Sequence, residues 1–528
     1  MADDASGAGD GRGTRTSDTR ARAADAQRPG GAPTHRAGRA AGQPRRGTAG
    51  DPHEAIRRGG DPAQGRGAGT GRRQDRAALG PVRERWSGPA VTDLVTVESA
   101  LGRVLAAIEA PVETERLPVG RALGRVLAEP VVGRVDLPPW DNSAMDGYAV
   151  HSEDLAAASE GSPVRLKVVG EVAAGAAPEG HVDPGTTMRI ATGAPVPPGA
   201  DAVVPVEETT PLDESGAVAG PRGRDAVGPV PVQVAVHRAI PAGGSIRLAG
   251  GDLIAGTSLV EAGLALNPAR IALAAGAGVA EVSVRRPVRV AVLATGNEVR
   301  QAGEELGPAG IPDANGPGLR ALVAAAGAEP IDLGIASDDE ADVRGRLVEA
   351  LDRADAVIVS GGVSVGPYDV VRAAFSAVGQ VELWRVAVQP GKPFAFGVAR
   401  RDSRAPVLLF GLPGNPVSTF VTFELFVRPA IRRLAGECLQ GREVDRGRLL
   451  EPVTKSHGRR AFLRVSSRRD AEGRVERDAQ GRVPVRLAGG QGSHVMTALA
   501  AADALAVVPE AVDALDAGSE VDLWWLDR

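Results

Sequence analysis

Apolar runs alternate with amphipathic segments between residues 286 and 440, and this alternation restricts the possible folds more than any other feature of the chain. The pattern predicts strands, with the turns that follow them, over 288–296, 330–336, 356–359, 381–388 and 407–416, and helices over 316–326, 339–354, 369–378 and 416 to about 435. Strands that alternate with helices form a doubly wound parallel sheet, and ligands bind outside the carboxyl ends of its strands. We therefore expect an α/β domain with a ligand site at one edge of its sheet.

Four loops rich in Gly, Asp, Ser and Asn fall at this expected edge. They are Thr295–Glu298, Ala336–Asp339, Ser360–Asp369 and Gly411–Pro416. In the third loop, glycines let the backbone approach a ligand closely, and successive N–H groups can bind an anion. Alternatively, Gly361 and Gly362 only form a tight turn, and Asp369 only caps the helix that follows. The four loops together favour a ligand site more than any one of them does.

The rest of the chain predicts helical and β-rich parts around this domain. Helical patterns cover 95–108, 118–127 and 268–277, whereas 164–236 alternates apolar and polar residues as strands do. Short alternating strands from residue 447 onwards indicate a separate β domain. We therefore predict a multidomain α/β-plus-β chain with an extension (1–90), a linker domain in two parts (91–135 and 241–285), an inserted β-rich domain (136–240), the α/β domain (286–440) and a C-terminal β domain (441–528).

The segment Asp136–Val150 combines three aspartates, an Asn and a Ser with three residues of a type usually buried: Trp140, Met145 and Tyr148. A polar turn held by Asx hydrogen bonds is one interpretation, and a functional loop is the favoured one. A second polar loop, 189–201, is expected between two strands of the β-rich domain. Near the C-terminus, Gln491–His494 is a candidate ligand-facing turn, although an ordinary turn is the better interpretation.

Composition excludes several classes of protein. The net charge of −5 over 528 residues argues against general nucleic-acid binding. The single cysteine, Cys438, excludes an internal disulfide framework and a cysteine-rich zinc site. No run of eighteen apolar residues predicts a membrane span, and the N-terminus lacks the apolar core of a signal peptide. We expect a soluble cytoplasmic protein without nucleic-acid or membrane partners.

The first 85 residues consist mostly of Gly, Ala, Arg, Asp and Pro and contain almost no large apolar side chain. Such a segment cannot bury enough surface to offset its conformational entropy, so we expect it to be disordered. Its excess of Arg leaves a nucleic-acid or acidic partner open, as an alternative to an extension without a defined role.

The expected site is rich in hard oxygen ligands, with carboxylates at Glu298, Asp313, Asp338, Asp339 and Asp369. Such a set, without cysteine or clustered histidine, suits Mg²⁺ bridged to a phosphate. Lys392 adds a compact positive charge and is one of only three lysines in the chain. No P-loop, nucleophile elbow or histidine triad is present. The residues alone therefore predict Mg²⁺-assisted chemistry on a phosphorylated or nucleotide-bearing ligand.

Several of these segments together resemble the molybdopterin molybdenumtransferase family, usually called MoeA. The matching motifs are Asp141–Ala149, Thr192–Pro197, Gly361–Gly366, Pro390–Pro393 and Gly411–Ser418, in the family's order, within roughly residues 92–528. The resemblance implies an elongated four-domain protein that works as a homodimer. It also implies that molybdate is inserted into the dithiolene of adenylylated molybdopterin with Mg²⁺, which releases AMP and molybdenum cofactor.

The resemblance assigns roles to residues through these motifs. The catalytic residues would be Asp146, Glu298, Asp369 and Lys392, of which Lys392 would bind oxygens of molybdate or pyrophosphate. The metal would be served by Asp313, Asp369 and Asp252, and a cation there would neutralise and polarise the pyrophosphate. The substrate and its nucleotide would contact Thr192, Asp313, Gly361, Gly362, Ser364, Gly366, Pro413, Gly414, Asn415 and Ser418.

The chain departs from the family pattern at two points. Relatives often have Lys before Pro-Gly-Lys-Pro, but this chain has Gln389, so Arg385 or an arginine from elsewhere would have to supply that charge. An acidic residue often precedes the position of Asp369 in relatives, but this chain has Pro367 and Tyr368 there. The resemblance therefore does not define the complete set of metal ligands.

Two other functions use a similar α/β domain. One is the preceding step, adenylylation of molybdopterin, and the other is a non-enzymatic scaffold. The Asp141–Ala149 loop and the additional domains favour molybdate insertion. The adenylyltransferase of the preceding step is a further candidate partner.

Overall fold

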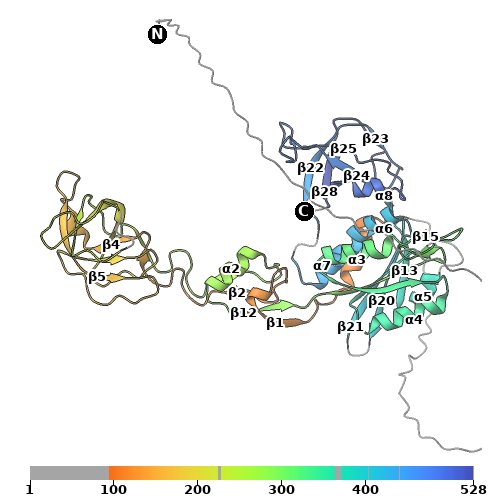
Figure 1. Cartoon of the computed structure of the whole chain (residues 1–528). Coiled ribbons are helices and arrows are strands. Elements are labelled where there is room, and N and C mark those ends of the chain that lie inside the picture. The colour runs from red at the N-terminus through yellow and green to blue at the C-terminus, as the bar shows by residue number, and fades with distance from the viewer. Residues whose placement is uncertain (1–93, 224–227, 363–369, 402–403, 439–440, 527–528) are drawn as a thin grey trace, which may run out of the picture. The chain divides into compact units, whose positions relative to one another are not determined.

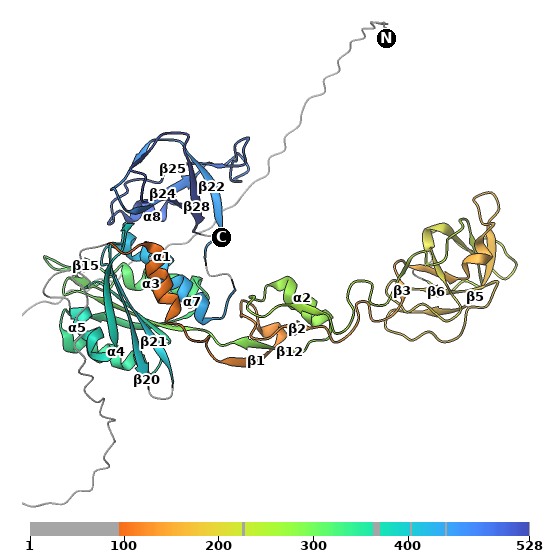
Figure 2. The same ribbon diagram turned by 180° about the vertical axis from the view of Figure 1, so that it is seen from behind.

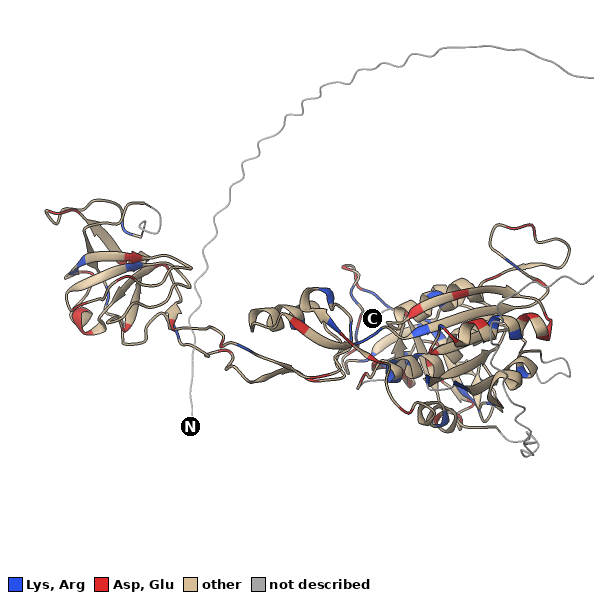
Figure 3. Cartoon of the chain, turned by 90° about the horizontal axis from the view of Figure 1, so that it is seen from below, with Lys and Arg blue, Asp and Glu red and all other residues tan. Residues whose placement is uncertain are grey.

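The computed structural model describes residues 94–528 apart from 224–227, 363–369, 402–403, 439–440 and 527–528 (Figure 1). The predicted N-terminal extension therefore lies outside the described residues, as do Ser364, Gly366 and Asp369. Within the described part, no helix is both long and apolar enough to cross a membrane. Acidic and basic positions are interspersed along the described ribbon, in keeping with the small net charge (Figure 3).

A six-stranded sheet forms the α/β domain, in the order β16-β13-β17-β21-β20-β18. Its four parallel strands are β16 (Glu329–Ala336), β13 (Arg289–Thr295), β17 (Ala356–Ser360) and β21 (Arg404–Leu412). They confirm the predicted doubly wound domain. One strand was missed: β20 (Pro393–Arg401) runs antiparallel to both β21 and β18 (Gln380–Arg385). Because β20 ends at Arg401 and β21 begins at Arg404, the connection is too short for the helix that a parallel crossover needs.

Helices cover both faces of this sheet (Figures 1 and 2). One core contains side chains from α1 (Val97–Ala106), α3 (Asn315–Ala325), α6 (Pro416–Thr422) and α7 (Arg428–Leu434), and α6 and α7 are joined by a π-helical turn, η4 (Phe423–Val427). The other core contains side chains from α4 (Glu340–Leu351) and α5 (Val370–Val378).

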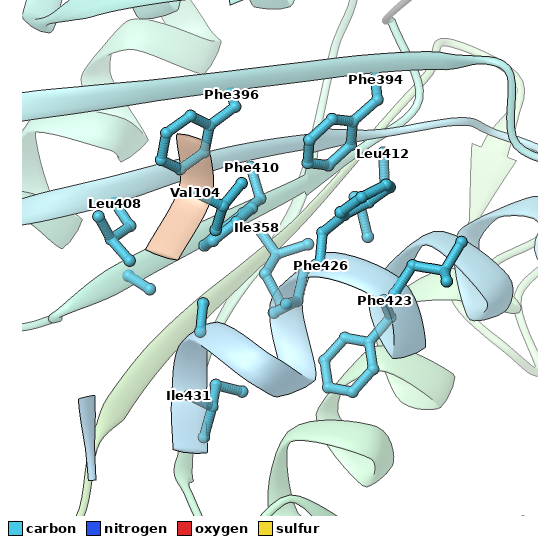
Figure 4. Close-up of a cluster of buried hydrophobic side chains, with 14 of the residues drawn as sticks. Val104, Ile358, Phe394, Phe396, Leu408, Phe410, Leu412, Phe423, Phe426 and Ile431 are labelled. Carbon is cyan, nitrogen blue, oxygen red and sulfur yellow. The ribbon is translucent and has the colours of Figure 1, made fainter. Parts of the chain in front are cut away.

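Aromatic side chains fill the first of these cores (Figure 4). Phe394, Phe410 and Phe426 are fully buried, and the rings of Phe394 and Phe426 lie 4.5 Å apart between centroids. Burying one such side chain contributes roughly 1.5–3 kcal/mol. The sheet is therefore rigidly held beneath the loops at its carboxyl edge.

Two segments far apart in sequence pack together as the linker part. Strand β1 (Thr114–Pro118) pairs with β12 (Glu281–Arg285), β2 (Val131–Val132) pairs with β11 (Ser258–Val260), and α2 (Pro268–Gly276) shares their core. The predicted helix over 118–127 is wrong. Pro118 ends β1, a single 3-10 turn follows (η1, Val119–Arg121), and Gly124 adopts a φ of 74°, which interrupts any helix.

The β-rich part holds a six-stranded sheet in the order β7-β4-β6-β5-β9-β8, and its β content agrees with the alternating pattern. Its strands are β4 (Gly147–Val150), β5 (Val164–Val172), β6 (Thr186–Ile190), β7 (Ala202–Pro205), β8 (Thr209–Leu212) and β9 (Gln233–Val236), with 3-10 turns η2 (Ser152–Leu155) and η3 (Val206–Glu208). Beside this sheet, β3 (Asn142–Ser143) pairs with β10 (Ile246–Arg247).

The C-terminal part is a sheet that closes on itself, because β24 pairs with β26 as well as with β25. Its strands are β19 (Val388–Gln389), β22 (Val444–Leu449), β24 (Arg460–Ser467), β25 (Val483–Leu487), β26 (Ala504–Val508) and β28 (Glu520–Trp525). The smaller elements are β14 (Val299–Arg300), β15 (Ile311–Pro312), β23 (Val453–Thr454), β27 (Ala514–Leu515) and α8 (Met496–Ala500). The domain boundaries given above stay predictions.

Candidate functional site

A cleft of about 710 Å³ lies at the carboxyl ends of β13, β17 and β21. Its walls include residues from all four loops that the sequence placed at this edge. Eight of the predicted site residues line it: Glu298, Asp313, Gly361, Gly362, Pro413, Gly414, Asn415 and Ser418. The structure thus brings these residues together, while their individual roles stay predictions.

Glycine backbone forms one wall of the cleft. Gly361 and Gly362 have φ angles of 92° and 64°, which other residues rarely adopt. A Cβ atom on Gly361 would lie 2.8 Å from the carbonyl oxygen of Thr295, and one on Gly414 would lie 3.6 Å from the Cα of Gly361. Three loops therefore meet backbone to backbone, which leaves room for a ligand to approach the main chain.

Polar side chains tie the loops to one another. Asp338 accepts a hydrogen bond from the Asn297 N–H (3.0 Å), and the Asn297 side chain accepts one from the Asp338 N–H (3.2 Å). Asn315 donates to the Gly414 carbonyl (2.8 Å). The hydroxyl of Ser360 is buried and has no hydrogen-bond partner among the described residues. The cleft is thus polar, its loops are hydrogen-bonded to one another, and the hydroxyl of Ser360 in its lining has no described partner.

The carboxylates of the cleft can bind a metal ion only if water and substrate phosphates supply most of its ligands. Within the described residues, no three Asp, Glu, His or Cys side chains gather as a metal site. Asp313 accepts from the Gly316 N–H through Oδ1 (2.9 Å), and Oδ2 receives no hydrogen bond from a described residue. Mg²⁺ often binds through one or two carboxylates and completes its shell with water and substrate phosphates. The residues fit that mode, and they do not form a resident metal cage.

The turn Gln389–Pro393 lies at the margin of the cleft, where Pro393 lines it. A Cβ atom on Gly391 would lie 2.6 Å from a methyl carbon of Thr422 and 3.6 Å from the Ser418 carbonyl, so this turn packs on α6. Burial, followed by the positive charges of Arg385 and Arg459, lowers the pKa of Lys392. Lys392 is therefore beside the cleft within a basic neighbourhood.

Asp146 and Thr192 meet in the β-rich part. The Thr192 N–H and hydroxyl both donate to Asp146 Oδ1, at 2.7 and 2.8 Å, and these two bonds hold the pKa of Asp146 below its ordinary value. Asp252 lies in another segment, where its N–H donates to the Leu137 carbonyl (2.9 Å). Within one chain, none of these three residues lines the cleft described above.

Two aspartates of the segment Asp136–Val150 accept hydrogen bonds from a segment that is distant in sequence, as in a structural loop. Asp136 accepts from the Ala255 N–H and Asp141 from the Ala249 N–H, each at 2.7 Å. Of the three residues of usually buried type, Tyr148 is fully buried, but Trp140 and Met145 are 46% and 41% exposed. Both interpretations of this segment thus retain support, because backbone hydrogen bonds shape the loop while Trp140 and Met145 stay exposed.

His494 and Asn315 line the cleft, but neither was assigned a role from the sequence. His494 lines it from the C-terminal part, and the preceding Ser493 accepts a hydrogen bond from the Val417 N–H at the start of α6 (3.1 Å). Asn315 lines it from the first turn of α3. The histidine lies in a turn that was interpreted as ordinary, and only the pairing between separate parts of the chain reveals its position.

Family models match almost the whole described chain. The MoeA N-terminal region (domain I and II) matches residues 95–278, a probable molybdopterin binding domain matches 291–433, and the MoeA C-terminal region (domain IV) matches 446–526. The chain is 37% identical over 400 residues to molybdopterin molybdenumtransferase 2 of Mycobacterium tuberculosis, which covers 75% of this chain and 90% of that protein. It is 34% identical over 396 residues to molybdopterin molybdenumtransferase of Haemophilus influenzae, with the same coverage.

Solved structures agree with these matches. Two structures of the molybdopterin biosynthesis protein MoeA from Pyrococcus horikoshii cover 82% of this chain and 99% and 100% of their own chains. Their TM-scores are 0.64 and 0.65, at 33% and 27% sequence identity. The chain therefore belongs to the MoeA family of molybdopterin molybdenumtransferases.

Proposed function

We propose that this protein is a transferase of molybdenum cofactor biosynthesis that inserts molybdate into the dithiolene of adenylylated molybdopterin and releases AMP. The observation that carries the proposal is the polar cleft with its glycine wall at the carboxyl edge of the sheet. The proposal is supported further by the names of relatives that are 37% and 39% identical to this chain over 400 and 310 aligned residues. The single exposed cysteine is compatible with a reducing cytoplasm.

Each wall of the cleft has a task in this reaction. The backbone at Gly361 and Gly362 leaves space for a phosphate group, and its N–H groups supply the donors that such a group needs. Asn415 and Ser418, at the start of α6, hold the nucleotide portion. Asp313 would hold Mg²⁺ together with Asp369, which lies outside the described residues, and Glu298 lines the same cleft. When bound, Mg²⁺ neutralises and polarises the pyrophosphate.

We also propose that two copies of the chain form the working enzyme. The segments around β3 and β10 expose large apolar side chains on hydrogen-bonded neighbours: Trp140, Met145, Leu248 and Ile254. Clustered exposed apolar residues favour a protein interface. The same region carries Asp146, which does not line the cleft of its own chain. A two-fold dimer would present Asp146 of each chain to its partner's cleft in two equal sites.

The assay is AMP release from adenylylated molybdopterin in the presence and absence of molybdate. A molybdenumtransferase releases AMP only when molybdate is added. An adenylyltransferase would instead consume molybdopterin and ATP, and a scaffold would do neither. Failure to release AMP with molybdate and Mg²⁺ would overturn the proposed function.

A further inference from the structure

Asn315 is the first residue of α3, but its side chain does not cap that helix. The cap residue is Ala314, which makes no side-chain hydrogen bond, and the Gly316 N–H of the first turn donates to Asp313 (2.9 Å). Asparagine stabilises a helix best as its cap and is a poor residue within it. The side chain of Asn315 donates instead to the Gly414 carbonyl, in another loop of the cleft. The needs of α3 therefore do not explain the asparagine.

The hydrogen bond to Gly414 also fixes the orientation of the Asn315 amide. A carbonyl oxygen can only accept, so the group that contacts Gly414 is the Nδ2 amine, at 2.8 Å. The other end of the amide, Oδ1, can only accept, and no residue that the structure describes donates to it. Asn315 is half-buried and lines the cleft. The cleft thus contains an amide oxygen of fixed orientation that is left without a donor.

Asp313 supplies a second acceptor of this kind, two residues earlier in the chain. Its Oδ2 atom receives no hydrogen bond from a described residue, and a Cβ atom on Gly316 would lie only 2.3 Å from it. The oxygen is therefore held against the first turn of α3, in the lining of the same cleft. Two oxygens that only accept disfavour a phosphate and favour a ligand group that donates hydrogen bonds. This wall is chemically the opposite of the glycine wall, whose N–H groups suit a phosphate.

The Gly414 carbonyl connects the two walls. Gly414 accepts from Asn315 on one side, and a Cβ atom on Gly414 would lie 3.6 Å from the Cα of Gly361 on the other. A nucleotide whose phosphate binds the N–H groups at Gly361 therefore has its ribose next to the loop that Asn315 contacts. A ribose carries two neighbouring hydroxyl groups, each of which can donate a hydrogen bond. The ribose is thus the part of a nucleotide that matches this wall.

We propose that Asn315 is a specificity-determining residue whose Oδ1 atom accepts a hydrogen bond from a ribose hydroxyl, so that the cleft selects ribonucleotides over deoxyribonucleotides. This inference rests on the proposed function, since the nucleotide is the adenylyl group of adenylylated molybdopterin. The bond to Gly414 keeps the amide in the orientation that accepts. The amino group of the base and the water shell of Mg²⁺ also donate hydrogen bonds, and the test separates them from the ribose.

The test is calorimetry of the full-length protein with AMP, 2′-deoxy-AMP, 3′-deoxy-AMP and IMP, each with and without Mg²⁺. The wild type should bind AMP about three- to tenfold more tightly than the deoxy analogue that lacks the contacted hydroxyl, because Oδ1 then has no donor. In Asn315→Ala this ratio should fall to about one. Loss of the bond to Gly414 weakens all four ligands equally and does not change the ratio.

Asn267→Ala is the matched control. Asn267 caps α2 by accepting from the Arg270 N–H (2.9 Å), and it does not line the cleft. This variant should melt at a lower temperature and keep the wild-type ratio between AMP and the deoxy analogues. Thermal melting checks that each variant is folded, and the ratio for the wild type tests the proposal without any variant.

Each other outcome overturns the proposal in a recognisable way. Absence of AMP binding, or equal binding of AMP and both deoxy analogues by the wild type, would exclude the ribose contact. An unchanged ratio in Asn315→Ala would reduce Asn315 to a brace for Gly414. A changed ratio only between AMP and IMP would assign Oδ1 to the base, and a loss seen only with Mg²⁺ would assign it to the hydrated ion.

The inference and the proposed function can fail separately. If the ratio depends on Asn315 while the wild type releases no AMP with molybdate, the ribose contact stands and the proposed transferase function falls. If AMP is released but the deoxy analogues bind as AMP does, the function stands and the ribose contact falls.

Discussion

The cleft of the α/β domain and the Asp136–Val150 loop are built from the same residue types and use them differently. In the cleft, Asp313 and Asp338 each accept one backbone hydrogen bond and still line an open space. In the loop, Asp136 and Asp141 accept hydrogen bonds from the backbone N–H groups of residues 255 and 249, which are distant in sequence. Aspartates in a loop therefore do not identify a site. The position of a residue at the carboxyl edge of a parallel sheet is a far better indication of a ligand site.

The two regions also differ in the kind of side chain that lacks a partner within the described chain. The cleft has a buried hydroxyl, Ser360, without a described partner, and beside it the positive charges of Arg385 and Arg459 act on Lys392. The loop region has exposed Trp140 and Met145 beside an ionised Asp146. The first pattern suits a polar small molecule, and the second suits a protein surface. On our proposal they are the two halves of one site, contributed by different chains.

The largest effect is expected at Asp369, which lies outside the described residues. If it holds Mg²⁺ against the pyrophosphate, Asp369→Asn should lower AMP release by about a hundredfold or more. Asp339→Asn is a matched control, because Asp339 caps α4 through the N–H groups of Ala341 and Asp342 (2.9 and 3.0 Å). Asn and Asp cap helices comparably, so this control should keep its activity. Equal activity of the two variants would reduce Asp369 to a cap.

The next prediction asks whether the two regions form one site across a dimer. Asp146→Ala and Asp369→Ala should each be inactive alone. After subunit exchange, about half the dimers are mixed, and each mixed dimer has one intact site if the site is shared. AMP release should then recover to about a quarter of the wild-type value. Verified exchange without any recovery would place both residues in the site of a single chain.

A third prediction separates the cost of backbone strain from the shape of the cleft. Gly361→Ala and Gly327→Ala both force a positive φ on alanine, which costs about 1 kcal/mol or more. Only at Gly361 would the new Cβ also meet the Thr295 carbonyl, whereas at Gly327 it meets no atom within 4 Å. Gly361→Ala should therefore lower the affinity for AMP about tenfold, measured by calorimetry, while Gly327→Ala changes only the melting temperature. Equal AMP affinities would exclude Gly361 from the nucleotide wall.

Sequence reasoning succeeded where one local pattern decided the outcome. Alternation of strands and helices predicted the sheet, and the sheet predicted that Glu298, Asp313 and Asn415 would meet at one edge. It failed at Pro118–Leu127, where Gly124 breaks an apparently helical pattern, and at β20, because two strands joined by a short turn resemble no βα unit. Both errors concern the assignment of secondary structure to short segments of the chain.

Other features depend on contacts that no local pattern contains. His494 reaches the cleft because the Val417 N–H donates to the Ser493 carbonyl, far away in sequence. Arg459 lies near Lys392 only through the pairing of β19 with β24. The exposure of Trp140 is likewise a tertiary property, since tryptophan is usually well buried. The cleft itself was predictable, whereas the turn Gln491–His494 of the C-terminal part was only the less favoured alternative as a ligand contact.

The smallest predicted effect concerns the charge on Asp146. Two hydrogen bonds from Thr192 lower the pKa of this carboxyl, so they stabilise the fold at pH values above the pKa of the unfolded chain, near 3.9. That contribution is lost as the pH falls through the lower folded pKa. Thr192→Val removes the hydroxyl donor but keeps the N–H donor, so the folded pKa should rise part of the way towards its ordinary value. Thr192→Ser keeps both donors and should leave it unchanged.

The measurement is an NMR titration of the Asp146 carboxyl carbon in wild type and both variants between pH 2 and pH 6. Because Asp146 is exposed, the change in stability should be small and confined to acidic pH. At neutral pH the carboxyl stays ionised in all three proteins, so Thr192→Val should retain AMP release unless the hydroxyl itself contacts the substrate. An unchanged titration in Thr192→Val would show that the backbone N–H alone holds the charge. If Thr192→Val loses turnover at neutral pH while the pKa of Asp146 is unchanged, Thr192 contacts the substrate. Thr192 would then be a second residue of the loop region, besides Asp146, that belongs to the same site as the cleft.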